Sequence, residues 1–209
     1  MENVLVAGAN GTTGKKIVNL LKASQYFNPV AMVRKEEQKE QFEKDNITTV
    51  LGDLEKDVSH TVANIDKVIF AAGSGGKKVI AVDQEGAKNL IDASKKATIK
   101  KFVMLSSMGA DNPKASDDLQ DYLKAKQNAD EYLKSSDLIF AIVRPGSLTN
   151  DAGTGKIELK SKLGQQGAIT RDDVAQTLVR SLHDDAAINQ TFEIIQGDTL
   201  IGKAMDVIV

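Results

Sequence analysis

The stretch of sequence that decides the fold reads Val4-Leu5-Val6-Ala7-Gly8-Ala9-Asn10-Gly11-Thr12-Thr13-Gly14-Lys15-Lys16-Ile17-Val18. An apolar run leads into three evenly spaced glycines, and an amphipathic segment follows them. Such a turn lets the backbone reverse sharply, approach a pyrophosphate without a Cβ in the way, and pack a helix closely on a strand. The helix N-terminus then offers free N–H groups to the phosphates. The segment therefore predicts a dinucleotide site, against the alternative of an ordinary Gly-rich connection.

The rest of the chain repeats the alternation of short apolar runs with longer amphipathic segments. Continuous apolar runs are typical of strands that are covered on both faces, as in a parallel sheet. The expected strands are Val4–Ala7, Val30–Val33, Ile47–Leu51, Lys67–Ala72, Lys101–Leu105 and Leu138–Val143, and the expected helices are Gly14–Ala23, Glu36–Asp45, Lys56–Ala63, Lys78–Ala97 and Asp117–Ser135. This order predicts an α/β fold with a doubly wound, mainly parallel sheet.

The pattern changes after Pro145. The segment 151–167 is rich in glycine and lysine, Thr170 has the character of a helix N-cap, and Thr191–Ile195 reads as one more strand. We therefore expect a single domain over residues 1–209. Residues 151–209 would form a small C-terminal extension that supplies a substrate-side lid and the last helix and strand.

Composition excludes several classes of protein. The 209 residues carry 27 basic and 29 acidic side chains, a net charge of −2, which argues against a nucleic-acid partner. There is no cysteine, and His60 and His183 read as surface residues, so no metal site is expected. No apolar run approaches the roughly 18 residues of a membrane span, and no secretion signal is recognisable. A cytoplasmic protein, monomeric or homodimeric, with a small-molecule substrate is the expectation.

The residues after the second expected strand bear on the choice of cofactor. An NAD site usually carries an acidic residue there, which accepts hydrogen bonds from the ribose hydroxyls. This chain has Arg34 and Lys35 instead, and a guanidinium can bind a 2′-phosphate through its fork of donors. The exchange predicts NADP(H), against the alternative of a solvated basic pair balanced by Glu36 and Glu37.

Beyond this turn, the chain resembles the atypical branch of the short-chain dehydrogenase/reductases, which includes NmrA-like, epimerase-like and biliverdin-reductase-B-like proteins. The segments that carry the resemblance are Val6–Gly14, Gly52-Asp53-Leu54, Phe70-Ala71-Ala72-Gly73, Leu105-Ser106-Ser107 and Val143-Arg144-Pro145-Gly146. It implies a Rossmann fold. The cofactor contacts that follow from the glycine turn, the basic pair and the resemblance are Gly8, Asn10, Gly11, Thr12, Thr13, Gly14, Arg34, Lys35, Asp53, Leu54, Ala71, Ala72, Gly73, Lys126, Pro145 and Gly146. Asp53 and Leu54 would contact the adenine, Ala71–Gly73 the ribose, and Pro145 and Gly146 the nicotinamide.

Family chemistry requires a proton donor beside the substrate carbonyl. Residues four apart share one helix face, so Tyr122 and Lys126 form a tyrosine–lysine pair in which the cation makes the phenolic proton easier to release. Ser107 matches the substrate-orienting serine, with Ser106 as the second choice. The alternative is that Tyr122 packs on the sheet and Lys126 is solvated. Asp83 occupies the place of an asparagine in the typical members, and no chemistry is assigned to it.

These residues predict an NADPH-dependent oxidoreductase acting on a small carbonyl or quinone-like substrate, whose pocket would be lined by segments 108–117 and 148–167. Two alternatives stay open. One is an NmrA-like sensor of NADP(H) without turnover, which the replaced asparagine favours. The other is a nucleotide-sugar epimerase or dehydratase, ranked last because about sixty residues after the sixth strand leave little room for a large substrate.

Overall fold

The structure is a computed structural model that describes residues 1–208. Its centre is a nine-stranded sheet in the order β11-β8-β10-β6-β5-β4-β1-β2-β3. The strands are β1 Glu2–Ala7, β2 Phe27–Val33, β3 Thr48–Leu51, β4 Lys67–Phe70, β5 Lys101–Leu105, β6 Phe140–Pro145, β8 Lys156–Lys160, β10 Gln190–Gln196 and β11 Thr199–Leu200. Every neighbouring pair from β3 to β10 is parallel. The expected doubly wound, mainly parallel sheet is therefore confirmed.

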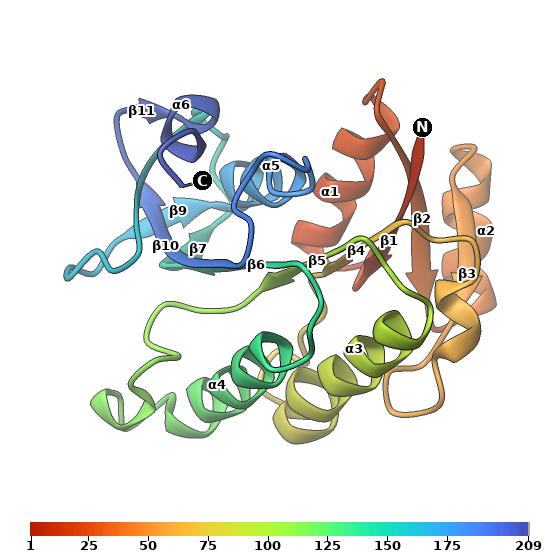
Figure 1. Cartoon of the computed structure of the whole chain (residues 1–209), viewed down its shortest axis with the longest axis horizontal. Coiled ribbons are helices and arrows are strands. Elements are labelled where there is room, and N and C mark those ends of the chain that lie inside the picture. Colours follow the sequence, from red (N-terminus) through yellow and green to blue (C-terminus); the bar gives the residue numbers. More distant parts are fainter. Residues whose placement is uncertain (209) are drawn as a thin grey trace.

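Helices cover both faces of this sheet (Figure 1), with α1 and α5 on one side and α3 and α4 on the other. The helices are α1 Thr12–Lys22, α2 Glu36–Lys44, α3 Gly86–Lys96, α4 Gln120–Lys134, α5 Arg171–Arg180 and α6 Ile201–Met205. In the part of the chain that the structure describes, no helix combines the length and apolarity needed to cross a bilayer.

The two-sided cover explains the continuous apolar runs. Successive strand residues point to opposite faces of a sheet. Val4 and Val6 pack into the core beneath α1 and α5, whereas Leu5 packs into the core beneath α3 and α4. Both faces are buried, so apolar residues are required at consecutive positions.

Two expected helices differ from the prediction. The segment 78–97 divides into a π-helical turn, η2 (Val79–Glu85), followed by α3, and the weak candidate at 56–63 is one 3-10 turn, η1 (Ser59–Val62). The π-helical turn has a consequence for the site, because it places Asp83 in the interior. A third short helix, η3 (Pro113–Ala115), precedes α4.

The C-terminal part contributes more to the sheet than expected. Strands β8 and β11 extend it as an antiparallel edge beyond β10, while β7 (Ser147–Thr149) and β9 (Ala168–Thr170) form a separate parallel pair. Thr170 caps α5 as predicted, since its hydroxyl accepts a hydrogen bond from the Asp173 amide at 3.1 Å. The Asp173 carboxylate in turn accepts one from the Gly155 amide at 2.7 Å, which fixes the start of β8 to α5.

The two histidines lie in different environments. His60 is exposed, as expected, with its Nε2 2.7 Å from the Leu51 carbonyl oxygen. His183 is half-buried rather than a simple surface residue, because its ring packs edge-on against Tyr26 and Phe27 at centroid distances of 5.4 and 5.2 Å. This burial lowers the pKa of His183.

Two buried lysines hold the turn between α5 and β10 to the amino ends of the central strands. Lys67, at the start of β4, donates to the Leu182 carbonyl at 2.9 Å and pairs with Asp184 at 2.6 Å. Lys101, at the start of β5, donates to the carbonyls of His183 and Ala186. Burial, with a smaller contribution from the neighbouring Lys67 cation, lowers the pKa of Lys101 to about 8.

This lowered pKa predicts a pH dependence of stability. The pKa of Lys101 is about 8 in the fold against 10.5 when unperturbed, so the unfolded chain binds more protons between these values. The free energy of unfolding should therefore rise from pH 8 to 10.5, by at most about 3 kcal/mol. Denaturant unfolding across this range should show the rise in the wild type but not in Lys101→Met. The exposed Lys96→Met is the control, and parallel profiles for the wild type and Lys101→Met would contradict the prediction.

Candidate functional site

The glycine turn between β1 and α1 is built so tightly that side chains are excluded. Gly8 adopts φ +86°, and a Cβ there would lie 2.6 Å from the Ala72 amide nitrogen at the end of β4. A Cβ on Gly14 would lie 2.1 Å from the Gly8 carbonyl oxygen. Gly11 closes the turn by donating its amide to the same oxygen at 2.9 Å. The geometry is that of a backbone cradle for a bulky anionic ligand.

The first turn of α1 completes this cradle. No side chain caps the helix, and no acidic residue lies in the turn. The amides of Thr12, Thr13 and Gly14 have no carbonyl acceptor within the helix, because they precede its hydrogen-bonded part. They contribute the positive end of the helix dipole, which favours a phosphate.

A cavity of about 470 Å³ opens beside the turn, at the carboxyl ends of β1, β2, β3 and β4. The chain leaves β1 toward β2 and β3 and then returns to β4 on the other side, so the cavity lies at the topological switch point, where doubly wound sheets bind ligands. The predicted cofactor residues that line it are Gly8, Asn10, Gly11, Arg34, Asp53, Leu54, Ala71, Ala72 and Gly73.

The other predicted cofactor residues lie outside this wall. Thr12 is exposed and Thr13 is buried at the start of α1, where Gly14 packs on the strand, and Lys35 is exposed at the start of α2. Lys126, Pro145 and Gly146 lie farther along the carboxyl edge, at α4 and the end of β6. The structure thus groups most of the predicted adenosine and pyrophosphate contacts around one cavity, and leaves the predicted nicotinamide contacts beyond it.

The cavity also has lining residues that the sequence reasoning missed: Met32, Val33, Gln38, Gly52, Ser74, Lys77, Lys78 and Val82. The positions of two of them, Gln38 and Lys77, could have been recognised in the sequence. Gln38 lies one helical turn after Arg34, and its side-chain oxygen accepts the Arg34 amide at 3.1 Å. The loop that carries Lys77 follows β4 directly, as cofactor-side loops do in such sheets.

Two of the three basic side chains that line the cavity form no ion pair within residues 1–208. Lys78 pairs with Glu55 at 2.7 Å, which ties the loop after β4 to the loop after β3. Arg34 and Lys77, by contrast, form no ion pair with any residue between 1 and 208. Both line the cavity, as does the Asp53 carboxylate.

Farther along the edge, Lys126 lies near the Tyr122 ring on the same helix. Lys126 is buried, with its side chain 4% exposed, so the alternative of a solvated lysine is wrong. Its Nζ lies 3.4 Å from the Leu105 carbonyl oxygen, 3.4 Å from Asp83 Oδ1 and 5.7 Å from the centre of the Tyr122 ring. The pair therefore meets the carboxyl end of β5.

The two serines after β5 differ in availability. The Ser106 hydroxyl is buried and donates to Asp130 Oδ2 at 2.9 Å. Ser107 is half-buried, and its hydroxyl makes only a 3.3 Å contact with the Met108 carbonyl oxygen. Ser107 is thus the serine whose hydroxyl is free to meet a ligand, in agreement with the order of preference from the sequence.

Asp83 links the two halves of the site. Its Oδ2 accepts hydrogen bonds from the amide and hydroxyl of Ser74, at 3.0 and 2.7 Å, while Oδ1 faces Lys126. A Cβ on Gly73 would lie 3.3 Å from Oδ1, so the cavity wall passes directly over this carboxylate. One buried acid therefore connects the loop after β4 with the lysine of α4.

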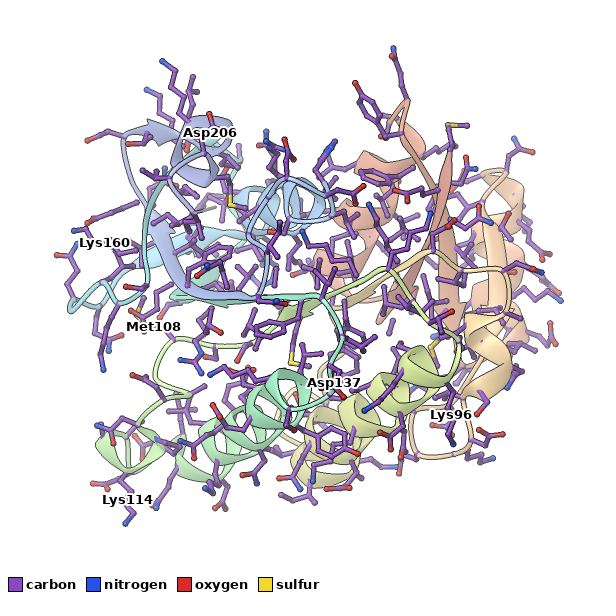
Figure 2. The ribbon with its side chains drawn as sticks, in the orientation of Figure 1. Lys96, Met108, Lys114, Asp137, Lys160 and Asp206 are labelled. Carbon is purple, nitrogen blue, oxygen red and sulfur yellow. The ribbon has the colours of Figure 1, made fainter. Side chains whose placement is uncertain are left out.

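An ion pair joins the two segments that were expected to line a substrate pocket. Asp111, in the loop after β5, meets Lys162, after β8, at 2.7 Å, and this pairing lowers the pKa of Asp111. In the view of Figure 2, Met108 lies between Lys114, just before α4, and Lys160, at the end of β8. The segments from the two halves of the chain thus approach each other on the side of the molecule that carries Ser107.

Comparison with known proteins identifies the family. A family model described as NAD(P)H-binding matches residues 8–185, and the chain belongs to that family. It is 39% identical to the "Uncharacterized sugar epimerase YhfK" of Bacillus subtilis, over 97% of this chain and 98% of that protein. The predicted resemblance to atypical short-chain dehydrogenase/reductases is confirmed.

Solved structures agree with this assignment. A Bacillus halodurans protein described as an NAD-dependent epimerase/dehydratase is 39% identical and has a TM-score of 0.95, covering 99% of this chain and 100% of that one. ChuY of Escherichia coli O157:H7, an anaerobilin reductase, is 25% identical with a TM-score of 0.84, covering 94% and 98%. The fold and the NAD(P)H-binding character are shared, whereas the reactions named for these relatives differ.

The turn geometry predicts unequal costs for two glycine substitutions. Gly8 and Gly76 both have positive φ, at +86° and +83°, but only Gly8 would place its Cβ against backbone, since nothing lies within 4 Å of a Cβ at Gly76. We expect Gly76→Ala to lower the free energy of unfolding by about 1–2 kcal/mol and Gly8→Ala by at least about 2 kcal/mol more. Denaturant unfolding of the two variants measures this difference, and equal losses would contradict the assigned packing.

Proposed function

We propose that this member of the NAD(P)H-binding family is an NADPH-dependent oxidoreductase that reduces a small carbonyl or quinone-like substrate. The observation that carries the proposal is the buried Lys126 beside Tyr122, at the strand end that presents Ser107. This group lies along the same carboxyl edge as the glycine cradle. A dinucleotide bound there would supply hydride, and the protein would supply the proton and the orientation of the substrate.

The proposed choice of NADPH rests on the two unpaired cations of the cavity. A 2′-phosphate adds negative charge that a ribose hydroxyl lacks, and guanidinium and ammonium groups bind it through charge-assisted hydrogen bonds. Arg34 and Lys77 both line the cavity, and neither forms an ion pair within residues 1–208. The glycine cradle and the open first turn of α1 fit the pyrophosphate.

The proposed proton transfer uses three side chains. Tyr122 donates its phenolic proton to the substrate oxygen, and the nearby Lys126 cation stabilises the resulting phenolate. Ser107 donates a hydrogen bond that orients the same oxygen. Asp83, 3.4 Å from Lys126, keeps the lysine directed toward the strand ends.

A sugar epimerase is the second candidate, because one relative is described as a sugar epimerase and one solved structure as an NAD-dependent epimerase/dehydratase. A tyrosine–lysine pair suits both reactions. After β6, however, strands β8, β10 and β11 belong to the central sheet. Few residues of this part of the chain are therefore left to enclose a nucleotide sugar. The reductase named among the relatives supports the first candidate. Net consumption of NADPH distinguishes the two, since an epimerase regenerates its cofactor in each turnover.

Cofactor preference should depend on the unpaired cations. We expect Arg34→Ala and Lys77→Ala each to weaken NADPH binding about 10- to 100-fold, the loss of one charge-assisted hydrogen bond, and to leave NADH binding unchanged. Titration calorimetry with both cofactors measures this. Lys39→Ala is the control, because Lys39 does not line the cavity and pairs with Glu36. Equal wild-type affinity for NADH and NADPH would refute the cofactor choice, as would an Arg34→Ala protein with unchanged preference.

The proton donor is tested by removing a single oxygen. Tyr122→Phe should lower kcat by about 100-fold or more in NADPH-dependent reduction of a panel of small quinones and aldehydes, such as 1,4-naphthoquinone and benzaldehyde. Stability should hardly change, since the Tyr122 hydroxyl bonds to no other residue of the described chain. Tyr132→Phe is the matched control on the same helix, where the hydroxyl bonds Asp92 at 2.8 Å. Undiminished turnover in Tyr122→Phe would reject the role, and a wild type inert toward the whole panel would favour an NADP(H) sensor.

A further inference from the structure

A buried carboxylate that the proposed reaction does not use lies behind the tyrosine–lysine pair. Asp130 follows Lys126 by four residues on α4, as Lys126 follows Tyr122, so all three lie on one helix face. Asp130 is fully buried. Its Oδ2 accepts three hydrogen bonds, from the Ser106 hydroxyl at 2.9 Å and from Nε and Nη2 of Arg144 at 2.9 and 2.8 Å.

The partners of Asp130 are direct neighbours of the predicted site residues. Ser106 directly follows β5 and immediately precedes Ser107. Arg144 lies in β6 and immediately precedes Pro145 and Gly146. A single oxygen atom therefore joins α4, β5 and β6, the three elements that carry the proposed proton donor, the substrate-orienting serine and the residues expected beside the nicotinamide.

Fold stability does not account for this arrangement. Two charges have been removed from water, and replacing such a pair by apolar residues of similar volume is often neutral or stabilising. Burial raises the pKa of Asp130 even though Arg144 and Ser106 favour its anion, and Oδ1 has no hydrogen-bond partner within residues 1–208. An apolar contact would hold the three elements together, but it would not fix their relative positions as hydrogen bonds from fixed directions do.

We propose that Asp130 is a positioning residue, which sets Ser107, Tyr122 and Lys126 in register by fastening the ends of β5 and β6 to α4. This inference rests on the proposed function for its catalytic consequence. Asp130 acts through Ser106 and Arg144 rather than by touching the substrate or the cofactor. Small displacements of reacting groups are costly, and about 1 Å can reduce a rate 100-fold.

The test replaces Asp130 and Arg144 by apolar residues. An effect on the stability of the fold can then be distinguished from an effect on the positions of the site residues. Asp130→Leu/Arg144→Met should keep the wild-type unfolding midpoint to within about 5 °C and NADPH affinity to within about threefold, while kcat falls at least about tenfold. Asp130→Asn keeps an acceptor oxygen for Ser106 and Arg144 and should retain more activity than the double variant. Leu133→Met is the control, because it changes a buried α4 residue without a polar contact.

A second readout does not depend on turnover. The chain contains no cysteine, so Ser107→Cys provides a unique thiol that can carry a trifluoromethyl label. We expect one narrow fluorine resonance when Asp130 is present, and a broadened or split signal in the Asp130→Leu/Arg144→Met background. This measurement decides whether Asp130 fixes the end of β5 even if the protein turns over no substrate. Absence of turnover would refute the proposed function but not the positioning role of Asp130.

Two results would overturn the inference. One is an apolar double variant with wild-type kcat and a single sharp resonance, which would show that the polar network is dispensable for position. The other is a fall in kcat that parallels a loss of stability in both the double variant and Asp130→Asn, which would make the network a structural one.

Discussion

The constraint on which the rest of the structure depends is the absence of space between the β1–α1 turn and β4. Gly8 lies against the backbone of Ala71 and Ala72, and Gly14 lies against the Gly8 carbonyl, so neither position has room for a Cβ. This contact fixes the direction in which α1 leaves the sheet. It also leaves the cavity beside the turn, because the chain separates there toward β2 on one side and β4 on the other.

The two halves of the site are built by different means. The cavity half is mostly a property of the backbone: glycines, the first turn of α1 and the strand ends, with cations at the rim. The half around Lys126 is a property of buried charge, in which Asp83 and Asp130 hold side chains from neighbouring elements. A backbone cradle accepts any dinucleotide of the right shape, whereas buried charges specify where a proton can move.

The sequence predicted the parallel half of the fold because each element there carries a local signal. Buried strands are continuously apolar, and the glycine spacing marks the turn. It did not predict β8 and β11, which are short and antiparallel, so that the strand character of β8 depends on pairing with β10 and that of β11 on pairing with β8. Among the predicted site residues, Tyr122 and Lys126 were chosen from their helical spacing together with the resemblance to the family. The contacts of Ser106, Asp83 and Asp130 required the tertiary structure, since their partners lie in other elements of the fold.

The hydrogen bonds from Lys67 and Lys101 to the turn after α5 separate a fixed part of the molecule from the loops that can vary. These lysines anchor the C-terminal part at the amino ends of the central strands, whereas the cavity, Ser107 and the Asp111–Lys162 contact lie at the carboxyl ends. Strands of five residues separate the two by roughly 17 Å. Substitutions in the loops at the carboxyl ends therefore leave the contacts of Lys67 and Lys101 intact.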